Sequence, residues 1–417
     1  MKIAFFSDCY LDLTGGIVTS INAEKAALES RGHTVYIFSS SFPKSKKQRE
    51  ELAQNHIFPV KSCRIFGRGV VPIARRPRVI ERELIKGHPE LKDFDIFYVH
   101  YEAGCSIAGL RLAKMFHIPS VQVMHGREDV GEENIIPYGL RTFVAANLNW
   151  FHSWYLPHQV KVSKDDYLAP TIARAKMWTL MVNHANSADL VITPSEHFCD
   201  KLVYYGVTKP IVPLHHGVSD RLVDEKTTPK SIKKGQPLEI IWHSRLSREK
   251  RLLPFLRALA KIPSKSYHLS IYGSGPDEPE ARAYAKLHRL STTFYGNVDF
   301  TEIWQALKKS HLDLLVSYDF DTFGMTLIEA EAAGVPVFIV DPDMTEIVPA
   351  GSFVLSSGPS SAQMAAALNI LLDHPDEISK MSAKMLESRD QIRISAKIDR
   401  LEQLFHNLES QKSHKNH

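Results

Sequence analysis

The chain of 417 residues contains little cysteine and no long apolar run. Its four cysteines, Cys9, Cys63, Cys105 and Cys199, have the spacing of neither a metal site nor a redox pair. We therefore expect free thiols and a reducing compartment, the cytoplasm. No apolar run approaches the roughly 20 residues that a helix needs to cross a bilayer. The opening MKIAFF is expected to form a strand and not a signal peptide.

Common cofactor and metal motifs are missing as well. Gly15 and Gly16 lie at a strand-to-helix turn, but they are not part of a GxGxxG pattern, which argues against a dinucleotide cofactor. No Walker-type phosphate loop and no Ser/His/Asp or Cys/His arrangement can be placed. Asp-X-Asp starts at Asp93, Asp319 and Asp341, and a pattern this frequent does not indicate a metal. The net charge of +4 permits anionic partners without requiring them, and we expect no nucleic acid.

The sequence does contain a repeated alternation of apolar strands and helices. A hydrophobic content of 44% and a length of 417 residues suggest two soluble domains of about 200 residues each. The polar segment 218–237 is the expected linker. Two such series predict an α/β protein with two doubly wound Rossmann-like domains, 1–217 and 218–393, facing a cleft that binds a ligand. The last helix, within 394–417, is expected to return to the N-terminal domain.

The most informative stretch is DTFGMTLIEAEAAGVP, from Asp321 to Pro336. The apolar run Leu312–Val316 before it predicts a buried strand, and the pattern becomes helical near Gly324. The first turn of a helix offers unpaired N–H groups and a positive dipole end, which suit a phosphate. The carboxylates of Asp321 and Glu329 could then hold sugar hydroxyls. The acids alone do not favour this over an ordinary strand–helix–strand unit.

Cationic residues follow the predicted strand Leu238–Trp242. Arg245 comes after its end, and Lys250 lies five positions on, at the expected start of a helix. Arginine can grip a diphosphate with its planar fork and lysine as a point charge, although surface turns often carry charges too. In the first domain, His125 follows the end of a strand, where doubly wound sheets bind ligands. A capping histidine would explain that position equally well.

Two segments of the first domain are candidates for contact with a membrane. Segment 61–86 carries eight Lys and Arg against two Glu, with Val and Ile between them. A solvated basic face is the usual meaning of such a run. A patch on an anionic membrane competes with it, because each cation near the headgroups gains about 1 kcal/mol. Segment 140–160 is rich in aromatic residues, which indicates either core packing or a helix facing lipid or acceptor.

A set of motifs follows in a fixed order along nearly the whole chain. They are Gly15-Gly16, Gly32-His33-Thr34-Val35, Ile118-Pro119 with His125-Gly126, Ile192-Thr193-Pro194-Ser195, His216-Gly217-Val218, Arg245 with Lys250, Tyr272-Gly273-Ser274-Gly275-Pro276, Gly296-Asn297-Val298, and Phe323-Gly324-Met325 through Glu329-Ala330 to Gly334-Val335-Pro336-Val337. The stretch beginning at Phe323 is the most specific of them. In order and spacing, this set resembles the retaining, nucleotide-sugar-dependent glycosyltransferases of the two-Rossmann GT-B architecture, which include bacterial diacylglycerol glucosyltransferases.

The resemblance implies a role for each matching residue. Gly16 would approach the donor phosphate, and His125 would contact the donor sugar beside the reacting carbon. Arg245 and Lys250 would neutralise the diphosphate and its departing charge, and Glu329 would bind the ribose hydroxyls. The remaining binding residues would be those beside the base, Asn297 and Val298, and those whose backbone amides hold phosphates and sugar, Phe323, Gly324, Met325 and Thr326.

Asp321 departs from the family, whose two-glutamate motif usually has the longer acid at this position. We retain it as a catalytic candidate with a shorter reach to the sugar hydroxyls. The resemblance implies no catalytic metal and no cofactor besides the nucleotide sugar as co-substrate.

The opening TGGIVTSI and residues 101–136 look most like diacylglycerol glucosyltransferases. We therefore expect a retaining hexosyltransferase that moves glucose from UDP-glucose to diacylglycerol. It would be peripheral on the anionic inner face of the cell membrane. Galactose or mannose donors, a saccharide or protein-linked acceptor, and a non-catalytic partner subunit remain alternatives, and the oligomeric state is not predicted.

Overall fold

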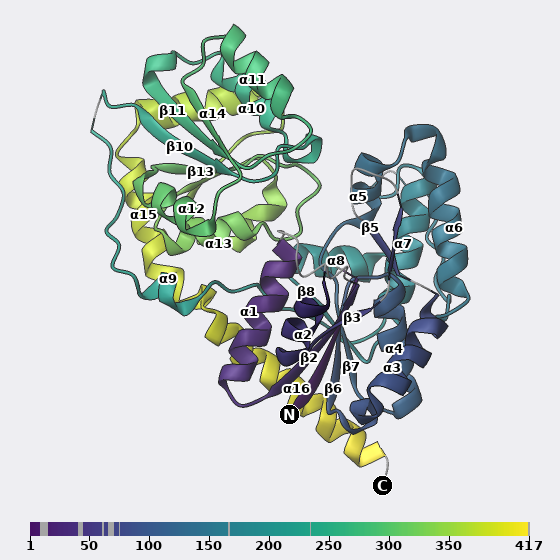
Figure 1. The fold of residues 1–417 in the computed structure, drawn as a ribbon. Helices are drawn as coiled ribbons and strands as arrows, with labels where there is room; N and C mark the ends of the chain where they lie inside the picture. The colour runs from purple at the N-terminus through teal and green to yellow at the C-terminus, as the bar shows by residue number, and fades with distance from the viewer. Residues whose placement is uncertain are drawn as a thin grey trace. The chain divides into compact units, whose positions relative to one another are not determined.

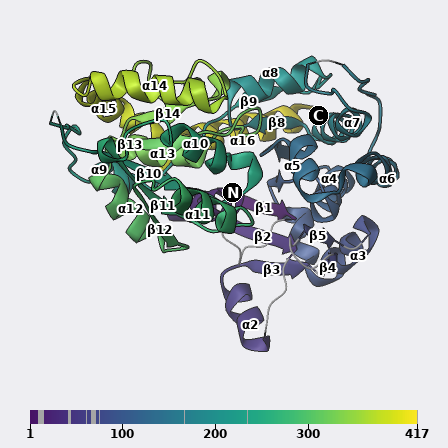
Figure 2. The same ribbon diagram turned by 90° about the horizontal axis from the view of Figure 1, so that it is seen from above.

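The computed structural model describes residues 1–8, 16–40, 45–60, 62–65, 71–74, 76–165, 167–233 and 235–415, without the side chains of 62–65, 71–74, 132–135 and 412–415. Contacts divide the chain into two compact units (Figures 1 and 2). Unit 1 comprises Met1–Leu214 with Lys397–His417, and unit 2 comprises His215–Ala396. The domain boundaries predicted from the sequence lie after residues 217 and 393.

Unit 1 is built on a seven-stranded sheet in the order β3-β2-β1-β6-β7-β8-β9, and all of its strand pairs are parallel. Its central strands are apolar almost without interruption, because helices cover both faces of a parallel sheet. The strands of the sheet are β1 Lys2–Ser7, β2 Thr34–Ser40, β3 Ile57–Val60, β6 Ile96–His100, β7 Ser120–Val123, β8 Leu190–Thr193 and β9 Ile211–Pro213. An antiparallel pair is formed by β4 Ser62–Ile65 and β5 Val71–Ala74.

The helices of unit 1 lie between these strands along the chain. They are α1 Gly16–Ser30, α2 Lys46–Gln54, α3 Pro77–Gly87, α4 Gly104–Phe116, α5 Glu128–Ile135, α6 Arg141–Ser153, α7 Ile172–Ala185 and α8 Glu196–Tyr204. The rings of Phe6 and Phe38 stack 5.3 Å apart in the core. A Cβ atom at Gly109 of α4 would lie 2.6 Å from Phe6 Cγ, so only glycine lets the helix approach this closely.

Unit 2 repeats the plan with a six-stranded parallel sheet in the order β12-β11-β10-β13-β14-β15. Its strands are β10 Leu238–His243, β11 Tyr267–Tyr272, β12 Thr292–Gly296, β13 Leu312–Leu315, β14 Val337–Ile339 and β15 Phe353–Leu355. Its helices are α9 Asp220–Asp224, α10 Leu252–Leu259, α11 Glu278–Leu287, α12 Phe300–Lys309, α13 Met325–Ala332, α14 Ser361–Asp373 and α15 Glu377–Ser388. The predicted α/β fold with two doubly wound sheets is confirmed.

Strand β10 shows why apolar residues can follow one another in these strands. Side chains alternate between the two faces of a strand. Ile240 and Trp242 belong to the core cluster that includes Phe255 of α10, whereas Ile241 belongs to the cluster that includes Leu327 of α13. Figure 1 shows helices on both sides of this sheet. Because both faces are covered here, the consecutive residues Ile240, Ile241 and Trp242 are all hydrophobic.

The last helix, α16 (Ile394–Lys415), passes from unit 2 into unit 1, as predicted. Its buried Lys397 forms an ion pair with Glu24 of α1, in which the two side chains are 4% and 1% exposed. Farther along, Glu402 lies 2.8 Å from Arg31 and 2.7 Å from His33. Polar pairs at both points of contact fix the register of the helix on unit 1.

Within the described ranges, no helix is both long enough and apolar enough to span a bilayer.

Replacing Lys397 by Met should weaken this attachment strongly. Removing one partner of a buried ion pair leaves the other charge uncompensated, at a cost of about 3–5 kcal/mol. The free energy of unfolding from urea titration measures the loss, and Lys397→Met combined with Glu24→Gln should recover much of it. Lys380→Met is the matched control, because Lys380 is 64% exposed beside Glu377 and should contribute nothing measurable. An equal effect of both lysine replacements would contradict the importance of the buried pair.

Candidate active site

Two loops at the carboxyl ends of β10 and β11 are packed together through glycines. Gly273 has φ of +116°, and a Cβ atom there would lie 2.2 Å from the carbonyl oxygen of Ser244. The backbone N–H of Leu246 donates to Ser274 O at 3.0 Å. Gly275 approaches Leu246 equally closely, with 2.3 Å from its ideal Cβ to the carbonyl oxygen. These contacts hold the loop that carries Arg245 at the edge of the sheet.

The two predicted cations differ in their surroundings. Arg245 is 69% exposed, and its guanidinium lies 3.3 Å from Glu249. Lys250 is only 14% exposed and donates to both carboxylate oxygens of Asp321, at 2.6 and 2.9 Å. Lys250 ends a 3-10 turn just before α10, which begins at Leu252 after Arg251 at φ of +63°. This turn directs Lys250 toward the loop after β13.

The loop after β13 is held by hydrogen bonds from its own aspartates and their neighbours. Asp321 also accepts a hydrogen bond from Ser317. Asp319 has φ of +50°, and its backbone N–H donates to Asp341 Oδ2 at 2.7 Å. The other oxygen of Asp341 accepts from the N–H of Asp343 at 3.1 Å. The carboxylate of Asp341 therefore shapes the backbone of the loop that presents Asp321.

Among the residues described, no three His, Cys, Asp or Glu side chains are grouped as metal ligands would be. The expectation that no metal or other cofactor is needed stays a prediction.

Helix α13 begins beside this loop. Gly324, at φ of +71°, precedes its first residue, Met325, so that the first-turn N–H groups lie at the sheet edge as a phosphate seat requires. Phe323 is 3% exposed and packs edge-on against the His216 ring, with centroids 5.0 Å apart. The buried Oγ1 of Thr326 has no hydrogen-bond partner among the described residues.

Glu329, on the same helix, forms an ion pair that sequence reasoning missed. Its Oε2 lies 3.4 Å from Nδ1 of His243, and Nε2 of that histidine lies 3.1 Å from Asp313 Oδ2. Burial alone would lower the pKa of His243, but the two carboxylates outweigh it and raise the pKa to about 10. The sequence held one signal, since a histidine and an aspartate inside apolar strands need partners when they are buried.

The predicted base-side residues follow β12. The carbonyl of Gly296 accepts a hydrogen bond from the Gly273 N–H at 2.7 Å, which ties this loop to the loop after β11. Asn297 is exposed, whereas Val298 is half-buried and packs on the apolar core. The structure thus brings the loops after β10, β11 and β12 together by their backbones.

In unit 1, the predicted His125 lies just beyond β7 and is nearly buried. Its Nε2 is 2.9 Å from Nδ1 of His100, at the end of β6, and the rings stack with centroids 5.2 Å apart. Burial lowers the pKa of His100 to about 4, so its ring is neutral at pH 7. Gly16 is the exposed first residue of α1, and Gly15 lies outside the described residues.

Two acids that follow β6 and β7 in the chain were not predicted as site residues. Glu128 accepts a hydrogen bond from the Tyr101 hydroxyl at 3.1 Å, and burial raises its pKa to about 7. Burial and the neighbouring Glu128 raise the pKa of Glu102 as well. Asp8, at the end of β1, instead caps α4 by accepting from the N–H groups of two of its residues. Acids follow so many strands in the sequence that no pattern distinguished these three.

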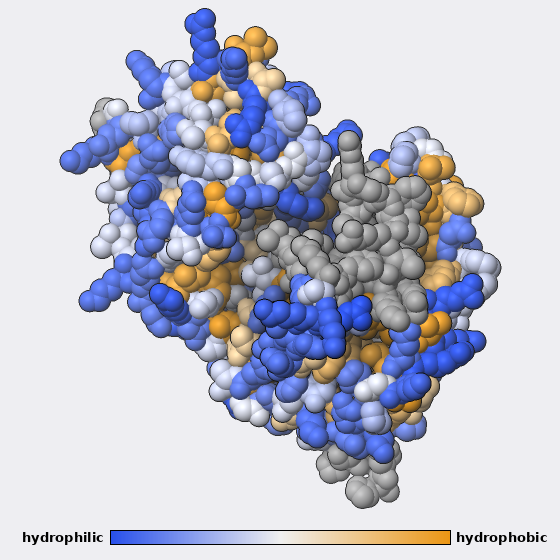
Figure 3. Space-filling model, in the orientation of Figure 1, coloured by the Kyte–Doolittle hydropathy of each residue, from blue (hydrophilic) through white to orange (hydrophobic). Residues whose placement is uncertain are grey.

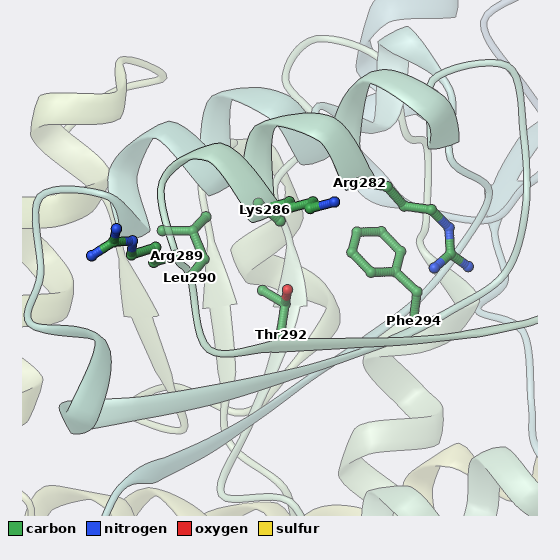
Figure 4. A pocket seen from close by; sticks show the side chains of 7 residues that line it. Arg282, Lys286, Arg289, Leu290, Thr292 and Phe294 are labelled. Carbon is green, nitrogen blue, oxygen red and sulfur yellow. The ribbon is translucent and has the colours of Figure 1, made fainter.

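A shallow hollow of about 250 Å³ lies apart from these residues, between α11 and β12 (Figure 4). None of the predicted site residues lines it. The guanidinium of Arg282 lies 4.5 Å from the centre of the Phe294 ring and pairs with Glu278. Two further cations, Lys286 and Arg289, stand along its rim.

Unit 2 thus brings together Lys250, which is paired with Asp321, the N-terminus of α13, and the carboxylate of Glu329 on that helix. This combination defines a class of two-sheet α/β protein with a site suited to a phosphorylated ligand. Residues 14–222 match the family model described as Glycosyltransferase Family 4, and residues 223–389 match that of Glycosyl transferases group 1. The chain belongs to these glycosyltransferases, as the resemblance predicted.

Two curated relatives share low but extended sequence identity. The chain is 24% identical over 357 residues to alpha-monoglucosyldiacylglycerol synthase of Acholeplasma laidlawii, covering 81% of this chain and 80% of that protein. It is 23% identical over 352 residues to a protein of the same name from Streptococcus pneumoniae, covering 81% and 70%.

Solved structures share the fold. HepE of Anabaena in complex with UDP has a TM-score of 0.68 and 16% identity, over 98% of this chain and all of that chain. Sucrose-phosphate synthase of Thermosynechococcus elongatus has a TM-score of 0.64 and 16% identity, over 98% of both chains. At these identities, the likeness concerns the fold alone.

Replacing Gly273 by Ala should displace the loop that carries Arg245. The left-handed backbone costs roughly 1–2 kcal/mol for a residue with a side chain. The new methyl would in addition collide with the Ser244 carbonyl. Gly235→Ala is the matched control, because Gly235 has φ of +88° with nothing within 4 Å of its ideal Cβ. Urea unfolding should show a clearly larger loss for Gly273→Ala, and equal losses would contradict the steric requirement.

Proposed function

We propose that this protein is a retaining hexosyltransferase that moves glucose from UDP-glucose to a diacylglycerol-type lipid. The observation that carries the proposal is that two groups able to bind an anion lie at one sheet edge. They are Lys250, which is paired with Asp321, and the N-terminus of α13. The names of the two curated relatives support the glucose and the lipid acceptor. A solved complex of HepE with UDP-glucose supports this donor for a protein of the same fold.

The proposed reaction breaks the bond between C1 of the sugar and the donor's phosphate oxygen. Negative charge builds up on the departing diphosphate, where Arg245 and Lys250 stabilise it. The acceptor hydroxyl adds to C1 from the same face and gives its proton to that phosphate oxygen, so the configuration is retained. Asp321 keeps Lys250 in place, Glu329 binds the ribose, and His125 contacts the donor sugar. No metal or further cofactor takes part.

Exposed aromatic residues on α6 support work at a membrane surface. Phe143 and Trp150 on α6, and Trp154 directly after it, are 68%, 58% and 55% exposed, so three large aromatic side chains are exposed within a short stretch of the chain. Figure 3 shows apolar side chains over the region where Figure 1 places α6. Tryptophan and phenylalanine favour the interface between headgroups and acyl chains. We propose that the enzyme is cytoplasmic and peripheral on the anionic inner face of the membrane. The basic segment 61–86, which supports the same proposal, lies partly outside the described residues.

Replacing Lys250 by Ala should lower kcat by a factor of about 10²–10³, the typical loss when one group that stabilises a developing negative charge is removed. Turnover of UDP-glucose with dispersed diacylglycerol measures the effect, and thermal unfolding checks that unit 2 stays folded. Lys286→Ala removes a cation beside the hollow in Figure 4 and should leave kcat unchanged. Unchanged turnover in the Lys250 variant would refute its role.

A panel of nucleotide sugars and acceptors tests the proposed substrates. UDP-glucose, UDP-galactose and GDP-mannose are each offered with diacylglycerol in anionic vesicles and with soluble saccharides, and mass spectrometry identifies the product. We expect glucosyl-diacylglycerol with an α-anomeric linkage by NMR. Product on saccharides alone would overturn the lipid acceptor, and no product with any pair would favour a non-catalytic subunit.

The same assays distinguish an effect on membrane binding from an effect on the transfer reaction. Trp150→Ala with Trp154→Ala should reduce both flotation with vesicles and activity on them, while activity on short-chain diacylglycerol in detergent is kept. Equal activity of this variant and the unaltered protein on vesicles would refute the role of α6.

A further inference from the structure

His243 occupies an unusual position for a charged residue. It is the last residue of β10, its side chain is 2% exposed, and it bridges two carboxylates that come from different elements. Asp313 belongs to the neighbouring strand β13 and is fully buried, whereas Glu329 belongs to α13 and remains 15% exposed. The imidazole therefore connects a carboxylate of the sheet to one that faces the candidate site.

The buried Asp313 requires this histidine to be charged. An isolated carboxylate inside a protein is costly unless an opposite charge or several hydrogen bonds compensate it. Oδ1 of Asp313 has no hydrogen-bond partner among the described residues, so His243 at Oδ2 carries the compensation. The raised pKa of the histidine is consistent with an imidazolium that donates from both nitrogens.

An imidazolium fixed in this way constrains Glu329. With Nε2 committed to Asp313, the ring orientation is set, and Nδ1 lies 3.4 Å from Glu329 Oε2. Attraction to Nδ1 favours one rotamer of the glutamate. One carboxylate oxygen then faces the histidine, and the other remains available to accept hydrogen bonds from a ligand.

We propose that His243, anchored by Asp313, is a positioning residue that orients Glu329 to recognise the vicinal hydroxyls of the donor's ribose. This inference rests on the proposed function, in which Glu329 binds the ribose. It assigns selection of ribonucleotides over deoxyribonucleotides to a chain of three residues instead of to one glutamate.

Discrimination between ribose and deoxyribose provides the test. Isothermal titration gives Kd for UDP, 2′-deoxy-UDP and 3′-deoxy-UDP with the full-length protein. A hydrogen bond to a charged group corresponds to roughly tenfold or more in affinity, so the unaltered protein should prefer UDP by about that factor. In His243→Gln, the ratio of the Kd for a deoxy analogue to the Kd for UDP should fall to about three or less. A neutral glutamine amide cannot compensate the charges of both carboxylates.

A second variant distinguishes a loss of preference from a loss of folding. His243→Gln leaves Asp313 buried without its countercharge, whereas His243→Gln combined with Asp313→Asn leaves a neutral amide pair of similar shape. The double variant should fold, as its thermal unfolding will report, and should have the same weakened preference. The matched control is His268→Gln on β11, which replaces a half-buried histidine that contacts Ser291 and Thr293. It should keep the full preference.

The outcomes separate the inference from the proposed function. A merely structural His243 would weaken UDP and both deoxy analogues by the same factor, and an unchanged preference in the double variant would overturn the inference. A preference that is absent from the unaltered protein would overturn it as well. If the unaltered protein binds none of UDP, GDP and ADP, the proposed function itself fails.

Discussion

Charge pairing at the carboxyl ends of the unit 2 strands is the constraint on which the candidate site depends. A charged side chain that leaves water must keep a partner of opposite sign, because desolvation costs several kcal/mol for each ion. Unit 2 meets this requirement twice, with Lys250 against Asp321 and with His243 between Asp313 and Glu329. Each arrangement joins segments that are distant in the sequence, so the pairing also determines where the functional groups lie.

The Lys250–Asp321 pair gives a physical reason for the shorter acid at position 321. The aspartate contacts the lysine through both oxygens and also accepts from Ser317, so its reach is matched to groups in its own neighbourhood. A lysine ammonium has three donors, and a diphosphate could use those that face away from the carboxylate. In this interpretation, Asp321 holds the cation for the donor and has no need to reach the sugar.

Much of the fold could be predicted because it follows from local patterns. The apolar runs predicted at Leu238–Trp242 and Leu312–Val316 became β10 and β13, each within one residue of the predicted end. The helical pattern near Gly324 became α13, preceded by the glycine in a left-handed conformation. Helix α10 begins at Leu252, directly after Arg251, whose positive φ separates the helix from the 3-10 turn that contains Lys250.

The sequence by itself determined the two α/β series, the family and the residues expected at the candidate site, since periodicity and motif spacing are local properties. Only the tertiary structure decided which charges are partners. Asp313 lies 70 residues after His243 and Asp321 lies 71 after Lys250, and the pairing of β10 with β13 as parallel neighbours brings the members of each pair together. No local pattern predicts such a pairing, because the cost of burying a charge appears only once the sheet has excluded water from it.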